Sequence, residues 1–142
     1  MSELLSNENF NIYTANSGYE GLEEFNSIKP KIVFLDNKMP SMDVITVLKK
    51  MKKNLIDCEI IMMTGYSEIN SAIEAIKEGA FSYLQKEQIN SDNIKSVIYN
   101  ALKKFNRQKN ILIIEDEDII RKKIKNLQIN LKKIFFGNCF NF

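Results

Sequence analysis

Four apolar segments of the sequence end in residues whose types could support chemistry. The segments KIVFLD, EIIMMTG, FSYLQK and ILIIED end, in order, in Asp36, in Thr64 and Gly65, in Lys86, and in Glu115 and Asp116. Taken singly, each of these residues is more often a turn former or a solvated charge. In an open parallel sheet, however, ligands bind beyond the carboxyl ends of the strands. The joint placement of these residues at strand ends therefore predicts one functional site.

The residue types in this set suit phosphoryl transfer to a carboxylate. Carboxylates brought together repel and raise one another's pKa unless a cation lies among them. Mg²⁺ takes oxygen ligands, commonly one or two carboxylates together with phosphate oxygens. The lysine and the hydroxyl could hold the remaining oxygens of a transferred phosphoryl group. We therefore predict a Mg²⁺ site in which Asp36 acts as the nucleophile.

The elements that must position these residues read as repeated strand and helix units. Five apolar segments recur every 20 to 30 residues or so, at 11–15, 31–36, 59–65, 81–86 and 111–116. Their continuous rather than alternating apolarity is typical of strands covered on both faces, hence of a parallel sheet. Helix signals lie between them: Ser17 and Glu20 have capping-box spacing, and Gly79 stands where a helix would stop. The sequence predicts an α/β fold with a doubly wound, five-stranded parallel sheet.

The composition excludes several classes of function. Twenty Lys and Arg against 18 Asp and Glu give a net charge of +2, so we expect no nucleic-acid partner. The absence of histidine excludes Ser-His and Cys-His nucleophile pairs, histidine-ligated metals and a phosphohistidine donor role. No apolar run approaches the ~20 residues of a membrane helix, and MSELLSNENF lacks the features of a signal peptide. We expect a cytoplasmic protein with no membrane partner.

At these motifs the sequence resembles the receiver domain of bacterial two-component response regulators. KIVFLDNKMPSMD resembles the segment around the phosphorylated aspartate, and IIMMTGY and GAFSYLQK resemble the segments that carry the family's threonine and lysine. ILIIEDED resembles the family's opening strand with its acidic pair. The resemblance covers about residues 10–127 and implies a flavodoxin-like receiver fold.

The resemblance also implies a role for each matching residue. Asp36 would be the phosphoacceptor. Mg²⁺ would be held by the side chains of Asp36 and Asp116 and the backbone carbonyl of Lys38, with Glu115 close by or bridging through water.

Three further residues match positions that bind the phosphoryl group or report on it. Lys86 and Thr64 would bind phosphoryl oxygens. Tyr83 matches the aromatic residue whose rotamer reports the state, so Thr64 and Tyr83 together would form the switch. They would carry the signal to a face made by 67–79, 81–85 and 91–106, where receivers meet partners.

Two positions depart from the family pattern. Glu87 follows Lys86 where the family usually has proline, so we expect a trans peptide and a differently aimed Lys86. Val44 stands where the family usually has glycine, so we expect an altered turn before the following helix.

The order of the segments is the largest departure, because the acidic strand comes last instead of first. One explanation is a circularly permuted single receiver-like domain over 1–142, in which strand 111–115 inserts into the middle of the sheet. Its parts would be a body (10–109), the acidic strand and first helix (110–127), and a lysine-rich helix extension and tail (128–142). The other explanation is a fragment of a tandem-receiver protein, whose halves could pair between chains as a domain-swapped dimer.

The function implied is that of a phosphoacceptor in a two-component phosphorelay. Asp36 would take its phosphoryl group from a sensor histidine kinase or a histidine phosphotransfer protein and switch a face that binds a downstream protein. The chain would be no enzyme beyond slow autodephosphorylation, and a monomer or a domain-swapped dimer. The alternative is a pseudo-receiver, an interaction module that works without phosphate.

Overall fold

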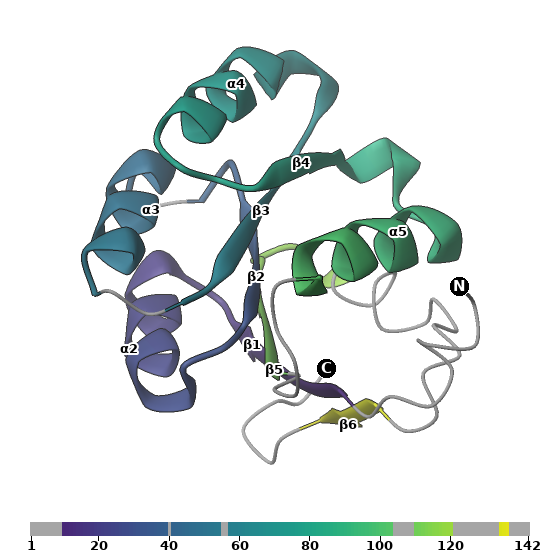
Figure 1. The fold of residues 1–142 in the computed structure, drawn as a ribbon. Coiled ribbons are helices and arrows are strands. Elements are labelled where there is room, and N and C mark those ends of the chain that lie inside the picture. Colours follow the sequence, from purple (N-terminus) through teal and green to yellow (C-terminus); the bar gives the residue numbers. More distant parts are fainter. Residues whose placement is uncertain (1–9, 40, 55–56, 104–109, 121–133, 137–142) are drawn as a thin grey trace.

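The chain forms a parallel sheet with helices on both faces (Figure 1). The computed structural model describes residues 10–39, 41–54, 57–103, 110–120 and 134–136. Its strands are β1 (Phe10–Ala15), β2 (Ile32–Asp36), β3 (Glu59–Thr64), β4 (Ser82–Gln85), β5 (Asn110–Ile114) and β6 (Ile134–Phe136). Its helices are α2 (Gly18–Ile28), α3 (Val44–Lys53), α4 (Ile69–Lys77) and α5 (Ser91–Leu102), with 3-10 turns η1 (Tyr66–Glu68) and η2 (Lys86–Gln88).

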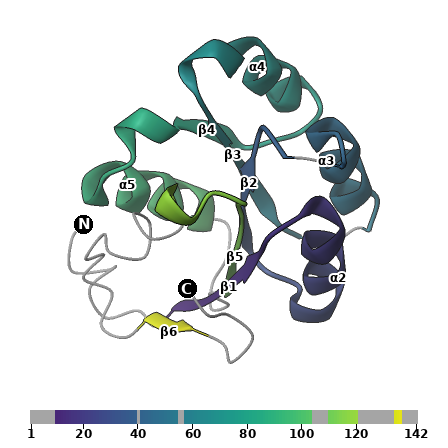
Figure 2. The same ribbon diagram turned by 180° about the vertical axis from the view of Figure 1, so that it is seen from behind.

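The late strand β5 lies in the middle of the sheet. The strand order is β4-β3-β2-β5-β1-β6, and every pairing is parallel. Ile111 of β5 pairs with Ile12 of β1 on one side and with Ile32 of β2 on the other. The predicted central insertion of this strand is confirmed, although the strand starts and ends one residue before the predicted 111–115. Figure 2 shows β5 continuing into a helical turn at 118–120.

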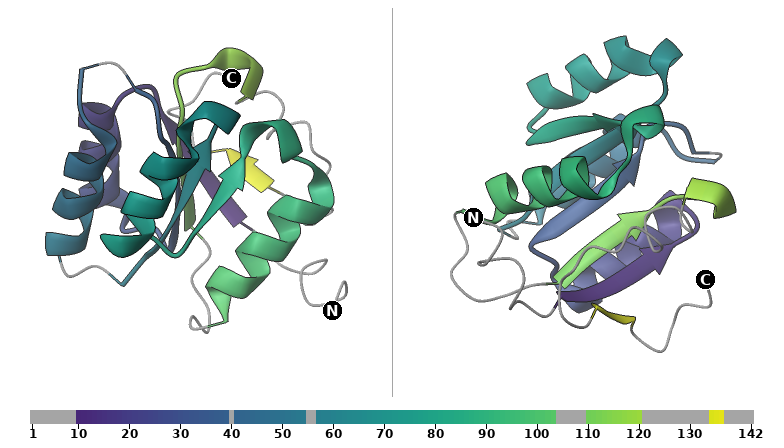
Figure 3. Two further views of the ribbon diagram at one scale, coloured as in Figure 1. Left: turned by 90° about the horizontal axis from the view of Figure 1, so that it is seen from above. Right: turned by 90° about the vertical axis from the view of Figure 1, so that its right-hand side faces the viewer.

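Two apolar layers, one on each face of the sheet, form the core. Helices α2, α3 and α4 pack on one face, and α5 packs on the other (Figure 3). β2 and β3 are buried along their whole length, which explains why they read as continuous apolar runs.

β5 packs closely against α2, a helix that lies far earlier in the sequence. Gly21 of α2 faces Ile114, and a Cβ at Gly21 would lie 2.5 Å from Ile114 Cδ1. Leu112 and Ile114 are fully buried in the layer under α2 and α3. A side chain at position 21 would therefore push Ile114 aside, and glycine lets α2 pack directly on β5.

The predicted helix signals at Ser17 and Gly79 are confirmed. Ser17 Oγ accepts a hydrogen bond from Glu20 N at 3.2 Å, while Glu20 Oε2 accepts one from Asn16 N at 2.7 Å instead of from Ser17 N. Gly79 follows α4 with φ of 107°, and Ala80 N donates to Ala75 O at 2.9 Å. Gly79 thus takes the left-handed backbone conformation that turns the chain into β4.

The C-terminal region differs from its prediction. A lysine-rich helix extension and tail were predicted over 128–142, but Ile134–Phe136 form β6, a sixth strand that pairs with β1 at the edge of the sheet. The apolar run IFF can pair with the open edge of β1, and edge pairing satisfies backbone groups that β1 would otherwise expose. Residues 1–9 and 121–133, which carry other predicted helical segments, lie outside the described residues. Among those described, every helix is too short or too polar to cross a membrane.

Candidate phosphoacceptor and metal site

Two buried carboxylates from neighbouring strands form the centre of the site. Asp36 ends β2, and Glu115 directly follows β5, the strand that pairs with β2. Both residues have a relative exposure of 0%. Asp116 and Glu117, which are exposed, continue the segment, and each of the four residues offers a carboxylate oxygen within 4.8 Å of the others. The central position of β5 therefore brings together acids that lie far apart in the sequence.

Lys86 lies among three of these carboxylates. Its Nζ is 3.0 Å from Asp36 Oδ1, 3.0 Å from Glu117 Oε1 and 3.3 Å from Glu115 Oε2. Lys86 follows β4 as the first residue of η2, and its side chain is 10% exposed. The peptide before Glu87 is trans, as expected. The expectation that Glu87 would aim this lysine differently is wrong, because the ammonium group of Lys86 lies against the Asp36 carboxylate.

Burial raises the pKa of the two buried acids, Asp36 and Glu115. Burial raises the pKa of Asp36, against the lowering effect of hydrogen bonds from the Lys38 backbone and of nearby Lys86. Burial and the charge of Asp36 raise the pKa of Glu115 to about 8. Burial alone would lower the pKa of Lys86, but hydrogen bonds to Glu117 and Asp36 raise it. The single ammonium group of Lys86 thus does not offset the effect of burial on the two inner acids.

The donor set fits a divalent cation. Asp36 Oδ2 and Glu115 Oε2 are buried without a hydrogen-bond partner, and Glu115 Oε2 meets Lys86 only as an ion pair. Oxygen atoms that are buried, negatively charged and unsatisfied are costly unless a cation joins them. Asp116 and Glu117 add exposed carboxylates on the solvent side. This all-oxygen set is the kind that Mg²⁺ prefers.

Lys38 and Thr64 lie at the ends of the two strands next to this cluster. Lys38 N donates to Asp36 Oδ1 at 3.1 Å, which fixes the orientation of the Asp36 carboxylate. Thr64 ends β3 and is fully buried, and its Oγ1 donates to Gly65 O at 3.2 Å. The structure thus places Thr64 beside the site with its hydroxyl on a neighbouring carbonyl.

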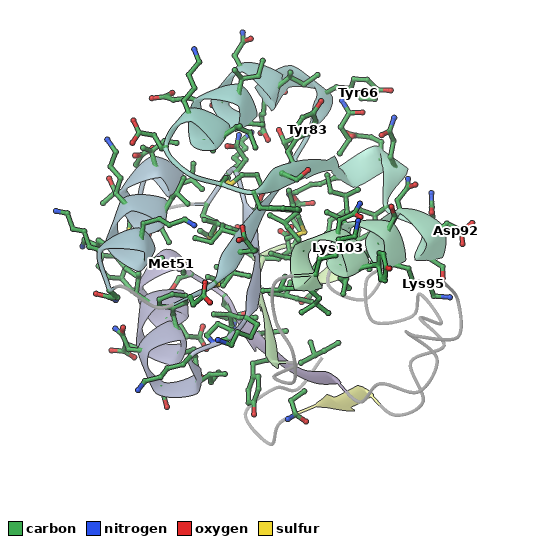
Figure 4. All side chains as sticks on the ribbon, in the orientation of Figure 1. Met51, Tyr66, Tyr83, Asp92, Lys95 and Lys103 are labelled. Atoms are coloured by element: carbon green, nitrogen blue, oxygen red, sulfur yellow. The ribbon has the colours of Figure 1, made fainter. Side chains whose placement is uncertain are left out.

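Tyr83 lies apart from the acids, on β4. Its side chain is at the surface (Figure 4), with a relative exposure of 42%. It borders a groove of about 600 Å³ between β4 and α5, whose lining also includes Gln88, Asn93, Asn100 and Lys103. The outward position of Tyr83 places it on the face predicted to meet partners.

Sequence reasoning missed Glu117, which the structure adds to the cluster. The signal was present, because ILIIEDED carries four consecutive acids at 115–118. The turn after β5 decides which of them face Lys86: Glu117 N donates to Glu115 Oε1 at 3.0 Å, and Glu117 Oε1 accepts from Lys86.

The second departure from the expected pattern is accommodated by the local fold. Val44 is the first residue of α3, where Asp43 caps the helix by accepting from Thr46 N at 3.1 Å. A positive φ of 74° lies at Ser41, three residues earlier. A β-branched residue at position 44 is therefore compatible with this helix start.

Curated proteins with similar sequences are regulators. Regulatory protein AtoC of Escherichia coli K12 is 33% identical over 111 residues, which are 78% of this chain and 24% of that protein. The DNA-binding transcriptional regulator NtrC of the same organism is 32% identical over 95 residues, 67% of this chain and 20% of that protein. The chain spans about a quarter or less of the length of these relatives.

Solved structures with a similar fold include receiver domains. A response regulator receiver domain protein from Clostridium thermocellum has a TM-score of 0.60 and 26% identity over 68% of this chain and 95% of that one. The receiver domain of NtrX from Brucella abortus has a TM-score of 0.60 at 22% identity, over 66% of this chain and 98% of that one, and shows the fold alone. The family model of the response regulator receiver domain matches residues 1–99, which contain Asp36, Thr64 and Lys86. The chain belongs to the family of response regulator receiver domains.

Proposed function

We propose that this chain accepts a phosphoryl group on Asp36 from the phosphohistidine of a sensor histidine kinase or histidine phosphotransfer protein. Receiver domains are phosphoacceptors and not typical enzymes. An Asp36 carboxylate oxygen would form the new bond to phosphorus while the bond from phosphorus to the histidine nitrogen breaks. The observation that carries the proposal is the buried Asp36 carboxylate, held 3.0 Å from the Lys86 ammonium among further acids.

The acids would hold Mg²⁺, which the family generally uses at an acidic site. The side chains of Asp36 and Asp116 and the Lys38 carbonyl are the proposed ligands, with Glu115 direct or through water. Bound Mg²⁺ would offset the negative charge of the acids and of the incoming phosphoryl group. The orphaned Asp36 Oδ2 supports this assignment.

Lys86 and Thr64 would bind the phosphoryl oxygens. Lys86 already lies against the acceptor carboxylate, and Thr64 would have to turn its hydroxyl away from Gly65 O. That rotation, with an inward movement of Tyr83, would carry the signal to the face of α4, β4 and α5, where a downstream protein would bind. The expected hydrolytic activity is slow autodephosphorylation of Asp36.

We infer a circularly permuted single domain as the reason for the unusual order of segments. The pairing of β5 with β1 and β2 of its own chain supports this reading, as does the packing of Gly21 on Ile114. A monomer then follows. The tandem-fragment reading would instead place β5 in another chain's sheet, as in a domain-swapped dimer.

The setting of the receiver in a longer protein is a separate proposal. The name of NtrC states that it binds DNA, and this chain corresponds to a fifth of that protein. The prediction that this chain itself has no nucleic-acid partner stays a prediction. We place the chain in the cytoplasm, where phosphohistidine donors of two-component systems work.

A pseudo-receiver is the second candidate, favoured by the replacement of proline by Glu87 and of glycine by Val44. Such a module would use the groove beside Tyr83 without any phosphoryl chemistry. The position of Lys86 against Asp36 argues for the first candidate.

Phosphorylation by a small acyl phosphate with Mg²⁺ separates the two. Acetyl phosphate should add one phosphoryl group, seen as a mass increase, and Asp36→Ala should abolish it. Asp116→Ala should label much more slowly, because it removes a proposed Mg²⁺ ligand. A wild-type chain that gains no mass would eliminate the phosphoacceptor and leave the pseudo-receiver.

A further inference from the structure

The ammonium group of Lys86 faces three carboxylates, and it donates a hydrogen bond to Glu117 Oε1 at 3.0 Å. A lysine ammonium carries three N–H groups. Three carboxylates surround it, at 3.0 Å for Asp36, 3.0 Å for Glu117 and 3.3 Å for Glu115. A phosphoryl oxygen on Asp36 that is to contact this ammonium must therefore compete with these carboxylates.

The three carboxylates differ in how firmly they are held. Asp36 and Glu115 have side chains that are 0% exposed, whereas the Glu117 side chain is 56% exposed. The two buried acids also accept backbone hydrogen bonds: Asp36 Oδ1 from Lys38 N, and Glu115 Oε1 from Glu117 N. Glu117 Oε1 can leave Lys86 and be solvated by water, while the other two would lose a partner inside the protein. Glu117 is the carboxylate that costs least to displace.

We propose that Glu117 occupies the place of the phosphoryl group on Lys86 in the unphosphorylated protein and is displaced when Asp36 is phosphorylated. The proposal rests on the proposed function and deepens it. With acetyl phosphate, an Asp36 oxygen forms the bond to phosphorus and the bond from phosphorus to acetate breaks, so acetate leaves and no proton is transferred. A phosphoryl oxygen then takes the Lys86 donor that Glu117 releases. Glu117 is thereby a positioning residue that acts through Lys86.

The first test compares rates of phosphorylation at saturating Mg²⁺. Glu117→Gln should be phosphorylated by acetyl phosphate about three- to tenfold faster than wild type, because a charge-assisted hydrogen bond no longer competes for Lys86. Glu87→Gln is the matched control, since it removes the same charge from an exposed residue directly next to Lys86 in the sequence. A slower or unchanged rate in Glu117→Gln overturns the proposal, and so does an equal acceleration in Glu87→Gln, which would indicate a general charge effect.

The second test needs neither phosphoryl group nor metal. Urea unfolding in the presence of a chelator is measured for wild type, Glu117→Gln, Lys86→Met and the double variant. Glu117→Gln should change the free energy of unfolding less in the Lys86→Met background than in wild type, because its partner is already gone. Additive effects overturn the resting contact and with it the proposal. A wild-type chain that takes no label would instead refute the proposed function, whereas a labelled wild type with an unaccelerated Glu117→Gln refutes this inference alone.

Discussion

The acidic cluster has a buried half and an exposed half, and the two are held in different ways. Asp36 and Glu115 are enclosed at the ends of paired strands, where burial raises the pKa of both. Asp116 and Glu117 follow on the same segment but face solvent. A buried charge is tied to the stability of the fold, since it cannot change partner without a large cost. An exposed charge can exchange one partner for another, whether a lysine, a cation or water, at little cost.

We expect the largest change in the free energy of unfolding from removal of Lys86, the cation beside the two buried acids. Lys86→Met leaves Asp36 and Glu115 without a cation, so we expect a loss of about 3 kcal/mol in the free energy of unfolding at pH 8, as for other broken buried ion pairs. Urea denaturation of the metal-free protein measures it.

The surface pair of Lys49 and Glu78 provides the control for this substitution. Their charged atoms are 3.7 Å apart, and the two side chains are 54% and 38% exposed. Lys49→Met should therefore cost less than about 0.5 kcal/mol. Equal losses in the two variants would show that Lys86 is no more important to stability than a surface lysine.

The pH dependence of stability should show the next largest effect. The pKa of Glu115 is raised in the folded protein to about 8, from an ordinary value of 4.5. Between these values the folded state binds more protons than the unfolded state, so the free energy of unfolding falls as pH rises from about 4.5 to 8. We expect this decrease to be on the order of 1 to 3 kcal/mol in metal-free protein.

Two comparisons sharpen the assignment of this slope to Glu115. Glu115→Gln keeps the shape of the side chain but cannot ionise, so its stability should vary less across the same pH range. Saturating Mg²⁺ should also reduce the slope in wild type, because a bound cation favours the ionised carboxylates. A slope that is the same in Glu115→Gln and wild type would contradict the shifted pKa.

The sequence allowed the architecture and most of the site to be predicted, for identifiable physical reasons. β2 and β3 are buried on both faces, so their apolar runs are continuous, and the carboxyl ends of parallel strands place Asp36, Lys86 and Glu115 at one edge. The central position of β5 could be predicted because β1 and β2 would otherwise each have an open edge.

Other features depend on interactions that no local pattern encodes. Glu117 reaches Lys86 because of the turn after β5, which is set by a hydrogen bond to Glu115. β6 is only three residues long, and it is a strand because the edge of β1 is available to it. The orientations of Thr64 and Tyr83 depend on rotamers, which composition and periodicity do not determine.

Calorimetric titration with Mg²⁺ tests most directly whether the late strand completes a cation site with Asp36. The titration compares wild type, Asp36→Asn and Asp116→Asn, each shown to be monomeric by size-exclusion chromatography with light scattering. The account predicts one Mg²⁺ per chain in wild type and a loss of at least about tenfold in affinity in each variant, as expected for removal of one charged ligand. Asp116→Asn should nevertheless unfold within about 0.5 kcal/mol of wild type, because Asp116 is exposed. Undiminished Mg²⁺ binding in Asp116→Asn would contradict the account.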